Sequence, residues 1–511
     1  MNTLSRRTLL KTSGAIVIGF ALGTKTQAQA RGAAEVDSFL IVKPDGTVTL
    51  LTSHVDIGTG LRIAYKQIAA EELGIPVERF TIVEGDTSLT PDHGGTGGSS
   101  GIPRGGVDIR RAAASARQTI LDLASQQLNR PAGDFTIENG EVRPGNLPVA
   151  SIIGGKRFET KVNPNAVVRN PSTYTVVGKP LLRSDVAEKC TARHNYLHDF
   201  ALPGMLHGRV VRPPVFGAKL LSIDESSVKH IPGIRVIRIE SFLGVVSKNE
   251  WAAVRAAREL KANWSEGQPL ETISDGFDRY ARSAPSNPGV PVLNRGNVDA
   301  ALPTSAKQLS ASYYWPFQSH ASLGPSCSVA DYQAGGVTTV WSSTQGPFGQ
   351  RALLAKVFGI PQDKMRVVYL DGSGSYGTNG ANDADADALL LSRAVNAPVR
   401  VQWSRQDELM CDPKGPAQTL DLRGGIDAQG NIVAWDVHMW LPSGPSGERA
   451  LLGPEAAGMP QEHGQNAGLM TQNADPGYTA TNVRVVAHNH KNTPLRPVSY
   501  THLTLPTILR V

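Results

Sequence analysis

The segment His54-Val55-Asp56-Ile57-Gly58-Thr59-Gly60 runs directly into a helical pattern and decides how the first part of the chain folds. From Leu61 to Ala69 the apolar residues recur at the spacing of one helix face, so we predict a helix over 61–73 that ends at Gly74. A turn of Gly and Thr at a helix start presents backbone N–H groups, and the helix dipole there attracts an anion. The segment is therefore a candidate phosphate-binding turn.

A second turn of the same kind follows in the sequence. Three short apolar runs around the first helix are predicted strands: 39–42, 48–51 and 80–83. Beyond them, Gly94-Gly95-Thr96-Gly97-Gly98-Ser99-Ser100-Gly101 precedes a predicted helix over 107–128. Two such turns could hold an extended phosphate-bearing cofactor. A flexible linker is the alternative interpretation, because glycine-rich loops are common.

Two polar loops follow strand candidates in the last third of the chain. The strand 337–341 leads into Ser342-Ser343-Thr344-Gln345-Gly346-Pro347, and the strand 365–370 leads into Asp371-Gly372-Ser373-Gly374-Ser375-Tyr376-Gly377. Helices are predicted after these loops, over 350–358 and 384–394. Proteins of the α/β class place ligands at such strand-to-helix junctions.

The second of these loops contains Gly372-x-Gly374-x-x-Gly377, which invites a dinucleotide-binding interpretation. We reject that interpretation on charge. Three acids crowd the start of the next helix, where a pyrophosphate would have to sit: Asp383, Asp385 and Asp387. The strand after it, 399–403, is followed by Ser404-Arg405, without an acid to hold a ribose hydroxyl.

The N-terminus has the pattern of an export signal for folded proteins. Ser5-Arg6-Arg7-Thr8-Leu9-Leu10-Lys11 carries paired arginines, 15–22 is weakly apolar, and Ala28-Gln29-Ala30 is a small-residue cleavage site. We predict a leader over 1–30 and a periplasmic mature protein. An anchored N-terminal helix is the alternative. No later run approaches the roughly 18 apolar residues of a membrane span.

Composition limits the class of protein. With 511 residues, 52 Gly and 34 Pro, the chain is long enough for about three loop-rich domains. The formal net charge of +6 falls to +2 without the four basic residues of the leader, which argues against nucleic-acid binding. Cys190, Cys327 and Cys411 are too dispersed for an iron–sulfur, zinc or haem site, and we interpret each as a buried thiol. Any redox relay must then lie on another polypeptide.

Taken together, these motifs resemble the large, molybdopterin-binding subunit of the xanthine dehydrogenase and aldehyde oxidase superfamily. The branch concerned contains isoquinoline 1-oxidoreductase, nicotinate dehydrogenase and periplasmic aldehyde dehydrogenase. The similarity covers 36–496, and its most specific segments are 54–60, 85–87, 203–214, 344–346 and 371–380.

The resemblance implies an α+β fold in several parts. It assigns 31–165 to an N-terminal molybdopterin-binding unit and 173–264 to an α/β hammerhead domain. That middle part shows strand candidates at 236–239 and 244–246 and a helix over 250–261, without a catalytic constellation. After a linker over 265–307, 308–496 would be an incomplete molybdopterin-binding domain.

The resemblance also implies roles for single residues. Gln345, followed by Gly346, matches the glutamine beside the apical oxo ligand of molybdenum. The loop beside the metal is matched by Gly374, Ser375, Tyr376 and Gly377. Residues matched to the grip on a molybdopterin cytosine dinucleotide are Gly58, Thr59, Gly60, Gly98, Ser99 and Arg496. The chain departs from many relatives at Thr59, where they have glutamine, and at Ser375, where cysteine is expected.

The implied reaction is hydroxylation of an aldehyde or an N-heteroaromatic compound, with oxygen from water. The family uses a glutamate as general base, and it lies beyond the segment matched by 492–496. We therefore expect a truncated chain with no catalytic residue and no metal ligand of its own, and an artefactual tail over 497–511. We interpret Glu408 and Glu455 as surface acids and the pair His488 and His490 as solvated strand ends.

The expected partners follow from the lack of cysteine sets for iron–sulfur clusters in this sequence. We expect a small subunit with two 2Fe–2S clusters, a cytochrome c acceptor and a small-molecule substrate, and no nucleic acid. Two other classes remain open: a non-catalytic periplasmic binding or scaffold protein on the same fold, and a nicotinamide enzyme.

Overall fold

The computed structural model combines helices and strands in two units, which confirms the α+β fold class. The residues that it describes are 16–19, 38–154, 158–215, 217–267, 279, 282, 289–380, 382–442, 450–461, 471 and 474–490. By their internal contacts, the first unit comprises Met1–Phe200 with Asp331–Gly372, and the second comprises Ala201–Ala330 with Ser373–Val511. The domain boundaries given above stay a prediction.

A five-stranded sheet forms the base of the first unit, in the order β4-β3-β2-β1-β8. Its strands are β1 (Ile16–Gly19), β2 (Ser38–Val42), β3 (Val48–Thr52), β4 (Phe80–Glu84) and β8 (Phe158–Lys161). The β2–β3 pair is antiparallel, and the β3–β4 pair is parallel. All three predicted strands of this region are therefore confirmed.

Strand β1 lies inside the predicted leader. Its backbone pairs with β2 on one side, antiparallel, and with β8 on the other, parallel. The same four residues were assigned above to the apolar part of an export signal. Cleavage after Ala30 stays a prediction, and it would take this strand out of the sheet.

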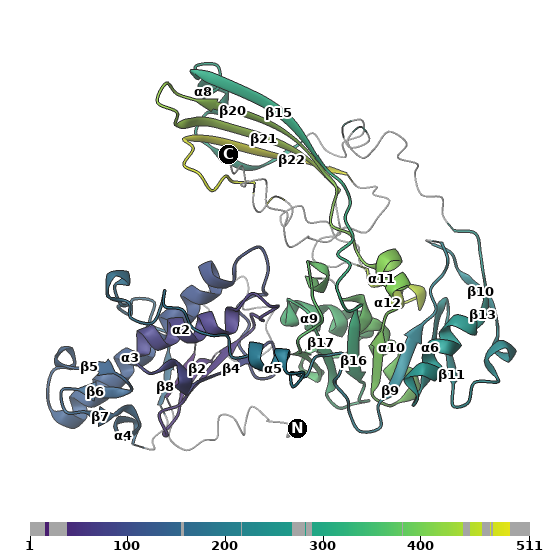
Figure 1. Ribbon diagram of the computed structural model, residues 1–511, viewed down its shortest axis with the longest axis horizontal. Coiled ribbons are helices and arrows are strands. Elements are labelled where there is room, and N and C mark those ends of the chain that lie inside the picture. The colour runs from purple at the N-terminus through teal and green to yellow at the C-terminus, as the bar shows by residue number, and fades with distance from the viewer. Residues whose placement is uncertain are drawn as a thin grey trace. The chain divides into compact units, whose positions relative to one another are not determined.

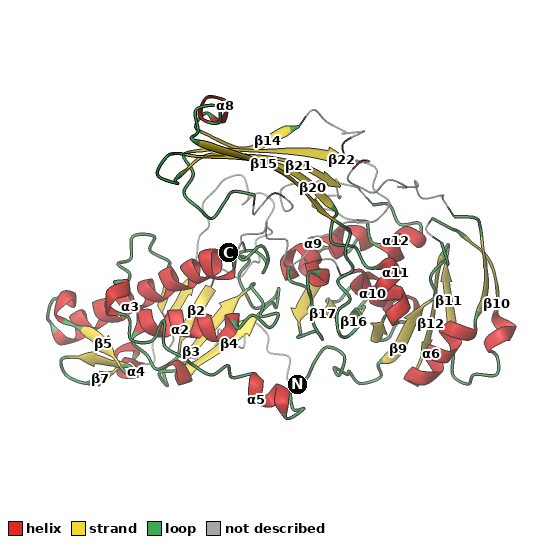
Figure 2. Cartoon of the chain, turned by 45° about the horizontal axis from the view of Figure 1, so that its top comes forward, coloured by secondary structure: helices red, strands yellow, loops and turns green. Residues whose placement is uncertain are grey.

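Two helices, α2 (Leu61–Leu73) and α3 (Val107–Leu128), pack on each other and against this sheet, and both have the predicted bounds (Figure 2). A core of buried side chains fills the space between helices and sheet, among them Leu40, Leu50, Tyr65, Leu73 and Ile109. Each side chain of this size contributes about 1.5–3 kcal/mol when fully buried.

Gly74 ends α2 in the left-handed region, at φ +68°. A Cβ there would lie 2.1 Å from the carbonyl oxygen of Ile137, so the turn excludes any side chain. This contact is why the helix ends where the sequence predicts.

The first unit has further helices and strands, most of which are labelled in Figure 1. They are β5 (Thr136–Glu138), β6 (Glu141–Arg143), β7 (Leu147–Pro148), α4 (Val149–Ile153), α5 (Val186–Cys190), β17 (Thr338–Ser342), α9 (Pro347–Phe358) and β18 (Met365–Tyr369). The parallel pair β17–β18 joins the N-terminal residues through backbone hydrogen bonds from Thr87 to Val367 (3.0 Å) and from Tyr369 to Gly85 (3.0 Å). The loop before α9 therefore lies on the same unit as the two glycine-rich turns.

The second unit contains two larger sheets. One has the local order β11-β12-β9-β19-β16, and the other runs β14-β22-β21-β20-β15 as long strands side by side (Figure 1). The strands are β9 (Leu206–Val210), β11 (Arg235–Ile239), β12 (Phe242–Ser247), β14 (Val290–Arg295), β15 (Lys307–Trp315), β16 (Cys327–Asp331), β19 (Val399–Gln402), β20 (Gln418–Ile426), β21 (Ile432–Pro442) and β22 (Asn482–His490), with β10 (Leu220–Asp224) and β13 (Lys261–Trp264) as a separate pair. Its helices are α6 (Glu250–Glu259), α8 (Val298–Ala301), α10 (Asp383–Val395), α11 (Arg405–Cys411) and α12 (Leu452–Ala456).

The three acids at the start of α10 are buried rather than solvated. Arg212 forms an ion pair with Asp387, and the Trp403 indole N–H donates to the same carboxylate at 2.9 Å. Asp383 accepts the backbone N–H of Leu452 at 3.0 Å. Protein groups thus surround the helix start, which agrees with the rejection of a pyrophosphate there.

The burial of Glu408 and of Cys190 was predicted wrongly from the sequence, the first as a surface acid and the second as a buried thiol. Glu408 is fully buried, because its carboxylate accepts the backbone N–H of Ser326 at 2.8 Å and α11 carries it inward. Burial raises its pKa. Cys190 is exposed instead of buried, since α5 places it on the surface. The burial of Cys327 is confirmed and raises the pKa of its thiol to about 12, and Glu455 is exposed as expected.

A largely buried ion cluster ties α2 to β4 and to Asp371, the second residue after β18. Arg62 donates through Nε to Glu84 (2.6 Å) and through its two terminal nitrogens to Asp371 (3.2 and 2.5 Å). Burial raises the pKa of Glu84 to about 7, and the attraction of Arg62 only partly opposes this because Asp371 shares that cation.

We predict a pH dependence from Glu84. The pKa of Glu84 in the folded state lies above its ordinary value, so the folded state holds the proton more tightly than the unfolded state. The contribution of this proton to the free energy of unfolding is full below about pH 4.5 and is lost as the pH rises through about 7. In urea unfolding between pH 4 and 8, the wild type should lose about 3 kcal/mol more than Glu84→Gln. Parallel curves for the two proteins would contradict the assignment.

A second prediction concerns Glu72, which is 1% exposed and pairs with Arg110 (2.9 Å) and Arg117 (2.7 Å). Glu72→Gln leaves two cations without their carboxylate, so we expect a loss of about 3–5 kcal/mol in unfolding free energy. The control is Glu141→Gln, which breaks a more exposed pair with Arg143 and should cost under about 1 kcal/mol. Equal losses would show that burial does not decide the effect.

Candidate functional site

The second glycine-rich turn presents an open backbone. Gly94, Gly97, Gly98 and Ser99 are exposed, and a Cβ at Gly94 or Gly97 would meet nothing within 4 Å. Gly98 and Ser99 follow each other in the left-handed region, at φ +54° and +57°. A non-glycine residue in that region is uncommon and marks a backbone shape fixed by its surroundings.

Side chains fasten this turn to the end of β3. Ser53 donates to the carbonyl of Gly94 at 2.7 Å. The hydroxyl of Thr96 accepts the N–H of Val55 and donates to the carbonyl of Val55, both at 2.8 Å. The turn is therefore fastened at Gly94 and at Thr96, which argues against a flexible linker.

Gln345 lies against the same turn. Its side-chain Nε2 donates to the carbonyl of Thr96 at 2.7 Å, and the Thr96 N–H donates to the Gln345 carbonyl at 2.9 Å. A Cβ on Gly95 would lie 2.8 Å from that Gln345 carbonyl, so the close approach needs glycine here. The structure thus brings Gln345 and Gly346 to the turn that carries Gly98 and Ser99.

The first glycine turn is used differently from the sequence prediction. Asp56, which is 1% exposed, accepts the backbone N–H groups of Gly58 (2.9 Å) and Gly60 (3.1 Å) through one oxygen and that of Arg62 (3.0 Å) through the other. A carboxylate of the chain itself therefore occupies the anion position at the start of α2. Any contact from Gly58, Thr59 or Gly60 to a cofactor must use other atoms of this turn.

A histidine that the sequence analysis did not single out lies beneath the second turn. His54 is 2% exposed, and its Nδ1 has no hydrogen-bond partner among the described residues. A Cβ on Gly105 would lie 3.0 Å from that nitrogen. Burial, and then the neighbouring His93, lower the pKa of His54 to about 4, so the imidazole is neutral near pH 7. The sequence signal for His54 is its position as the first residue of the 54–60 motif.

The other predicted glycine loop lies on the second unit. Gly374, Tyr376 and Gly377 have positive φ values, Ser375 is buried, and the Tyr376 side chain is 44% exposed. Hydrogen bonds from Ser322 to the Ser375 carbonyl (3.1 Å) and from the Gly324 N–H to the Ser373 carbonyl (3.0 Å) hold the loop.

Three buried polar residues support this loop from below. The hydroxyl of Thr378 donates to Asp412 at 2.5 Å, and Asp412 lies 3.0 Å from His320 Nδ1. The sequence analysis missed this set, because His320 and Asp412 are 92 positions apart and neither belongs to a local motif. Arg496, the last predicted cofactor contact, lies outside the described residues.

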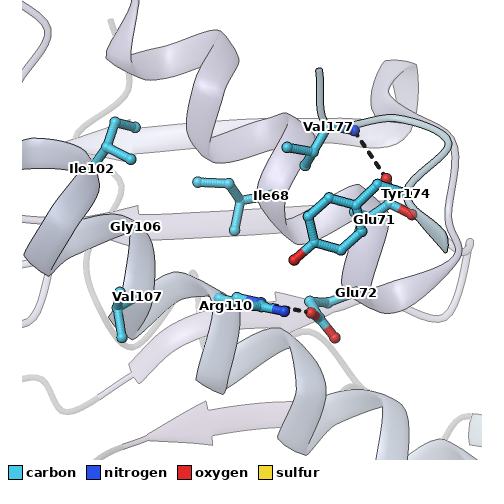
Figure 3. Close-up of a pocket in the computed structure, with 9 residues that line it drawn as sticks. All are labelled: Ile68, Glu71, Glu72, Ile102, Gly106, Val107, Arg110, Tyr174 and Val177. Atoms are coloured by element: carbon cyan, nitrogen blue, oxygen red, sulfur yellow. Dashed lines mark hydrogen bonds and ion pairs between the residues drawn. The ribbon is translucent and has the colours of Figure 1, made fainter. Parts of the chain in front are cut away.

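One pocket of about 180 Å³ opens between α2, the start of α3 and the segment 174–177 (Figure 3). Ile68, Ile102, Val107 and Val177 line it, while Glu71 and Glu72 are turned to their own partners at its edge. Ligand pockets usually measure about 300–1,000 Å³. None of the predicted site residues lines this pocket.

Metal and membrane features are absent from the part of the chain that the structure describes. There, no group of three or more His, Cys, Asp or Glu side chains is arranged to hold a metal ion. His488 is not the solvated strand end expected above: it is half-buried, lies 3.1 Å from His438 and stacks on Trp440. The His490 side chain is outside the description. No described helix is long and apolar enough to cross a membrane.

Comparison with known proteins gives matches over most of the chain. Residues 5–175 and 283–464 each match a molybdopterin cofactor-binding domain. A nicotinate dehydrogenase chain of Pseudomonas putida is 38% identical over 468 residues, which are 88% of this chain and 39% of that protein. The beta chain of the isoquinoline 1-oxidoreductase of Brevundimonas diminuta is 26% identical over 473 residues, 80% of this chain and 60% of that protein.

A solved structure shares the fold. The aldehyde oxidoreductase of Desulfovibrio gigas is 17% identical, with a TM-score of 0.50 over 69% of this chain and 42% of that chain. The chain thus spans between 39% and 60% of the length of these relatives. With two molybdopterin cofactor-binding domains and relatives of this kind, the chain belongs to the xanthine dehydrogenase and aldehyde oxidase superfamily, among its large, molybdopterin-binding subunits.

Proposed function

We propose that this chain is part of the molybdopterin-binding subunit of a hydroxylase that oxidises N-heteroaromatic compounds or aldehydes with oxygen taken from water. The proposal rests on the two hydrogen bonds between Gln345 and Thr96, which lies in the exposed glycine turn. The names of the relatives support the substrate class, because nicotinate and isoquinoline are both N-heteroaromatic compounds.

The residues of the first unit fit a large cofactor with phosphate groups. Gly94, Gly97 and Gly346 leave open space where a Cβ would stand, so a ligand can approach the backbone directly. His54 adds a buried ring nitrogen that has no partner among the described residues. Gly98, Ser99, Gln345 and Gly346 would hold the cofactor from this unit. The loop of Gly374, Ser375, Tyr376 and Gly377 belongs to the second unit, and its contact with the cofactor stays a prediction of the family resemblance.

When bound, the molybdenum cofactor supplies a Lewis-acidic metal that activates water and accepts the two electrons of the oxidation. The chain's own residues would position the cofactor and shield it from solvent. The amide of Gln345 is fixed at the edge of the glycine turn, and the neutral His54 carries a single N–H, so it adds polarity without charge. The general base is the glutamate predicted beyond residue 496.

The finer parts of the proposal concern cofactor form, location and partners. The cofactor is the cytosine dinucleotide, and the subunit works in the periplasm after export by the twin-arginine route. A small subunit with two 2Fe–2S clusters and a cytochrome c carry the electrons away. The absence of a Cys-x-x-Cys pair in the sequence supports a relay on another chain.

We predict about one molybdenum atom per subunit in the full-length protein purified from a host that makes the cofactor. Elemental analysis measures the metal, and nucleotide analysis after acid hydrolysis should release cytidine monophosphate rather than another nucleotide. Stoichiometric NAD binding without molybdenum would overturn the proposal in favour of a nicotinamide enzyme. A folded full-length protein that binds neither would favour the scaffold alternative.

A further prediction tests the place of the cofactor. At Gly97, which is exposed and has open space around its Cβ position, Gly97→Leu should leave the fold intact and fill the front of the turn. Molybdenum content should fall about tenfold or more, which corresponds to about 1.4 kcal/mol of binding free energy. The matched control is Gly133→Leu, at another glycine of the same unit with open space around its Cβ position, which should retain its metal. Equal metal content in both variants would place the cofactor elsewhere.

A further inference from the structure

We infer that Thr96 is a positioning residue that sets the orientation of the Gln345 amide, an inference that rests on the proposed function. Thr96 is not among the residues that the family resemblance assigns. It lies at the centre of the exposed glycine turn and contacts both the end of β3 and the loop before α9.

The side chain of Thr96 fixes its own peptide unit. Its hydroxyl accepts from the Val55 N–H and donates to the Val55 carbonyl, so both roles of the Oγ1 atom are filled by one residue. Val55 is fully buried and lies three residues after the end of β3. The backbone of Thr96 is therefore anchored to a rigid part of the first unit.

The fixed peptide unit then holds Gln345 at two points. The Thr96 N–H donates to the Gln345 main-chain carbonyl, and the Thr96 carbonyl accepts from the Gln345 side chain at 2.7 Å. A glutamine side chain has three rotatable bonds, so without such a partner its amide samples many orientations. The pair of contacts restricts both its backbone and its amide.

The contact also decides which end of the amide faces the turn. A peptide carbonyl accepts hydrogen bonds and donates none, so only the NH2 end of the amide can face Thr96. The amide oxygen is thereby turned to the opposite side. Gly95 limits other arrangements, because the two main chains approach so closely that a Cβ on Gly95 would lie 2.8 Å from the Gln345 carbonyl oxygen.

The role can be tested in the full-length subunit loaded with cofactor, by Thr96→Val. Valine keeps the β-branched shape and removes both hydrogen bonds to Val55. We expect a molybdenum content within about twofold of wild type, a changed Mo(V) signal in electron paramagnetic resonance, and a kcat about tenfold lower with an unchanged KM. Thr96→Ser, which keeps the hydroxyl, should restore the wild-type signal.

The control is Thr119→Val. Thr119 lies on α3 of the same unit, and its part-buried hydroxyl donates to the Ser115 carbonyl at 3.0 Å. Its loss should change neither the signal nor kcat. A purely structural role for Thr96 would make the two variants alike, with lower thermal stability and an unchanged Mo(V) signal, and would overturn the inference.

A second variant covers the case in which Thr96→Val does not fold. Gln345→Asn shortens the side chain by one methylene so that its amide no longer reaches the Thr96 carbonyl, while the bonds between Thr96 and Val55 stay intact. It should show the same change of the Mo(V) signal. A wild-type signal in a molybdenum-loaded Gln345→Asn would overturn the inference, whereas a wild type without molybdenum would instead defeat the proposed function.

Discussion

Buried carboxylates that collect several donors hold the loops of the first unit in place. Asp56 takes the three N–H groups at the start of α2, and Glu71 takes those of Thr175, Val176 and Val177. Asp371 joins Arg62, Lys189 and His194. Long loops without regular hydrogen bonding need such acceptors, because each buried N–H group must find a partner. Every exposed glycine of the candidate site depends on a loop fastened in this way or through Thr96.

This arrangement has a cost that the chain offsets by pairing. An isolated buried carboxylate is strongly unfavourable, and most of these are matched by guanidinium groups or by several backbone donors. Glu84 shows the balance, since its one cation is shared with Asp371 and its pKa rises to about 7. The same logic keeps His54 neutral under the glycine turn, where a charged ring would be costly.

Much of the local structure follows from the sequence, because it depends on neighbouring residues. The helices over 61–73 and 107–128 have their predicted bounds, since periodic apolar residues and a left-handed terminal residue, Gly74 or Asn129, define them. The fold class and the family were also predicted correctly from the sequence. The role of Gln345 at the cofactor stays a prediction, although its neighbourhood is now known.

What the sequence did not reveal depends on residues far apart in the chain. Glu408 accepts a backbone N–H of the distant Ser326, and Asp412 joins His320 to Thr378. Periodicity reports which face of an element is buried, but it does not report which polar group meets a distant one. Thr96 escaped notice for the same reason, because a threonine within a glycine run has no special signal.

Strand β1 has a consequence for the predicted leader. Its four residues pair with β2 on one side and with β8 on the other, so the predicted cleavage after Ala30 would remove an inner strand of this sheet. Withdrawing it would leave the buried main chain of Leu40, Ile41 and Val42 without its neighbour, a loss that another extended segment would have to make good.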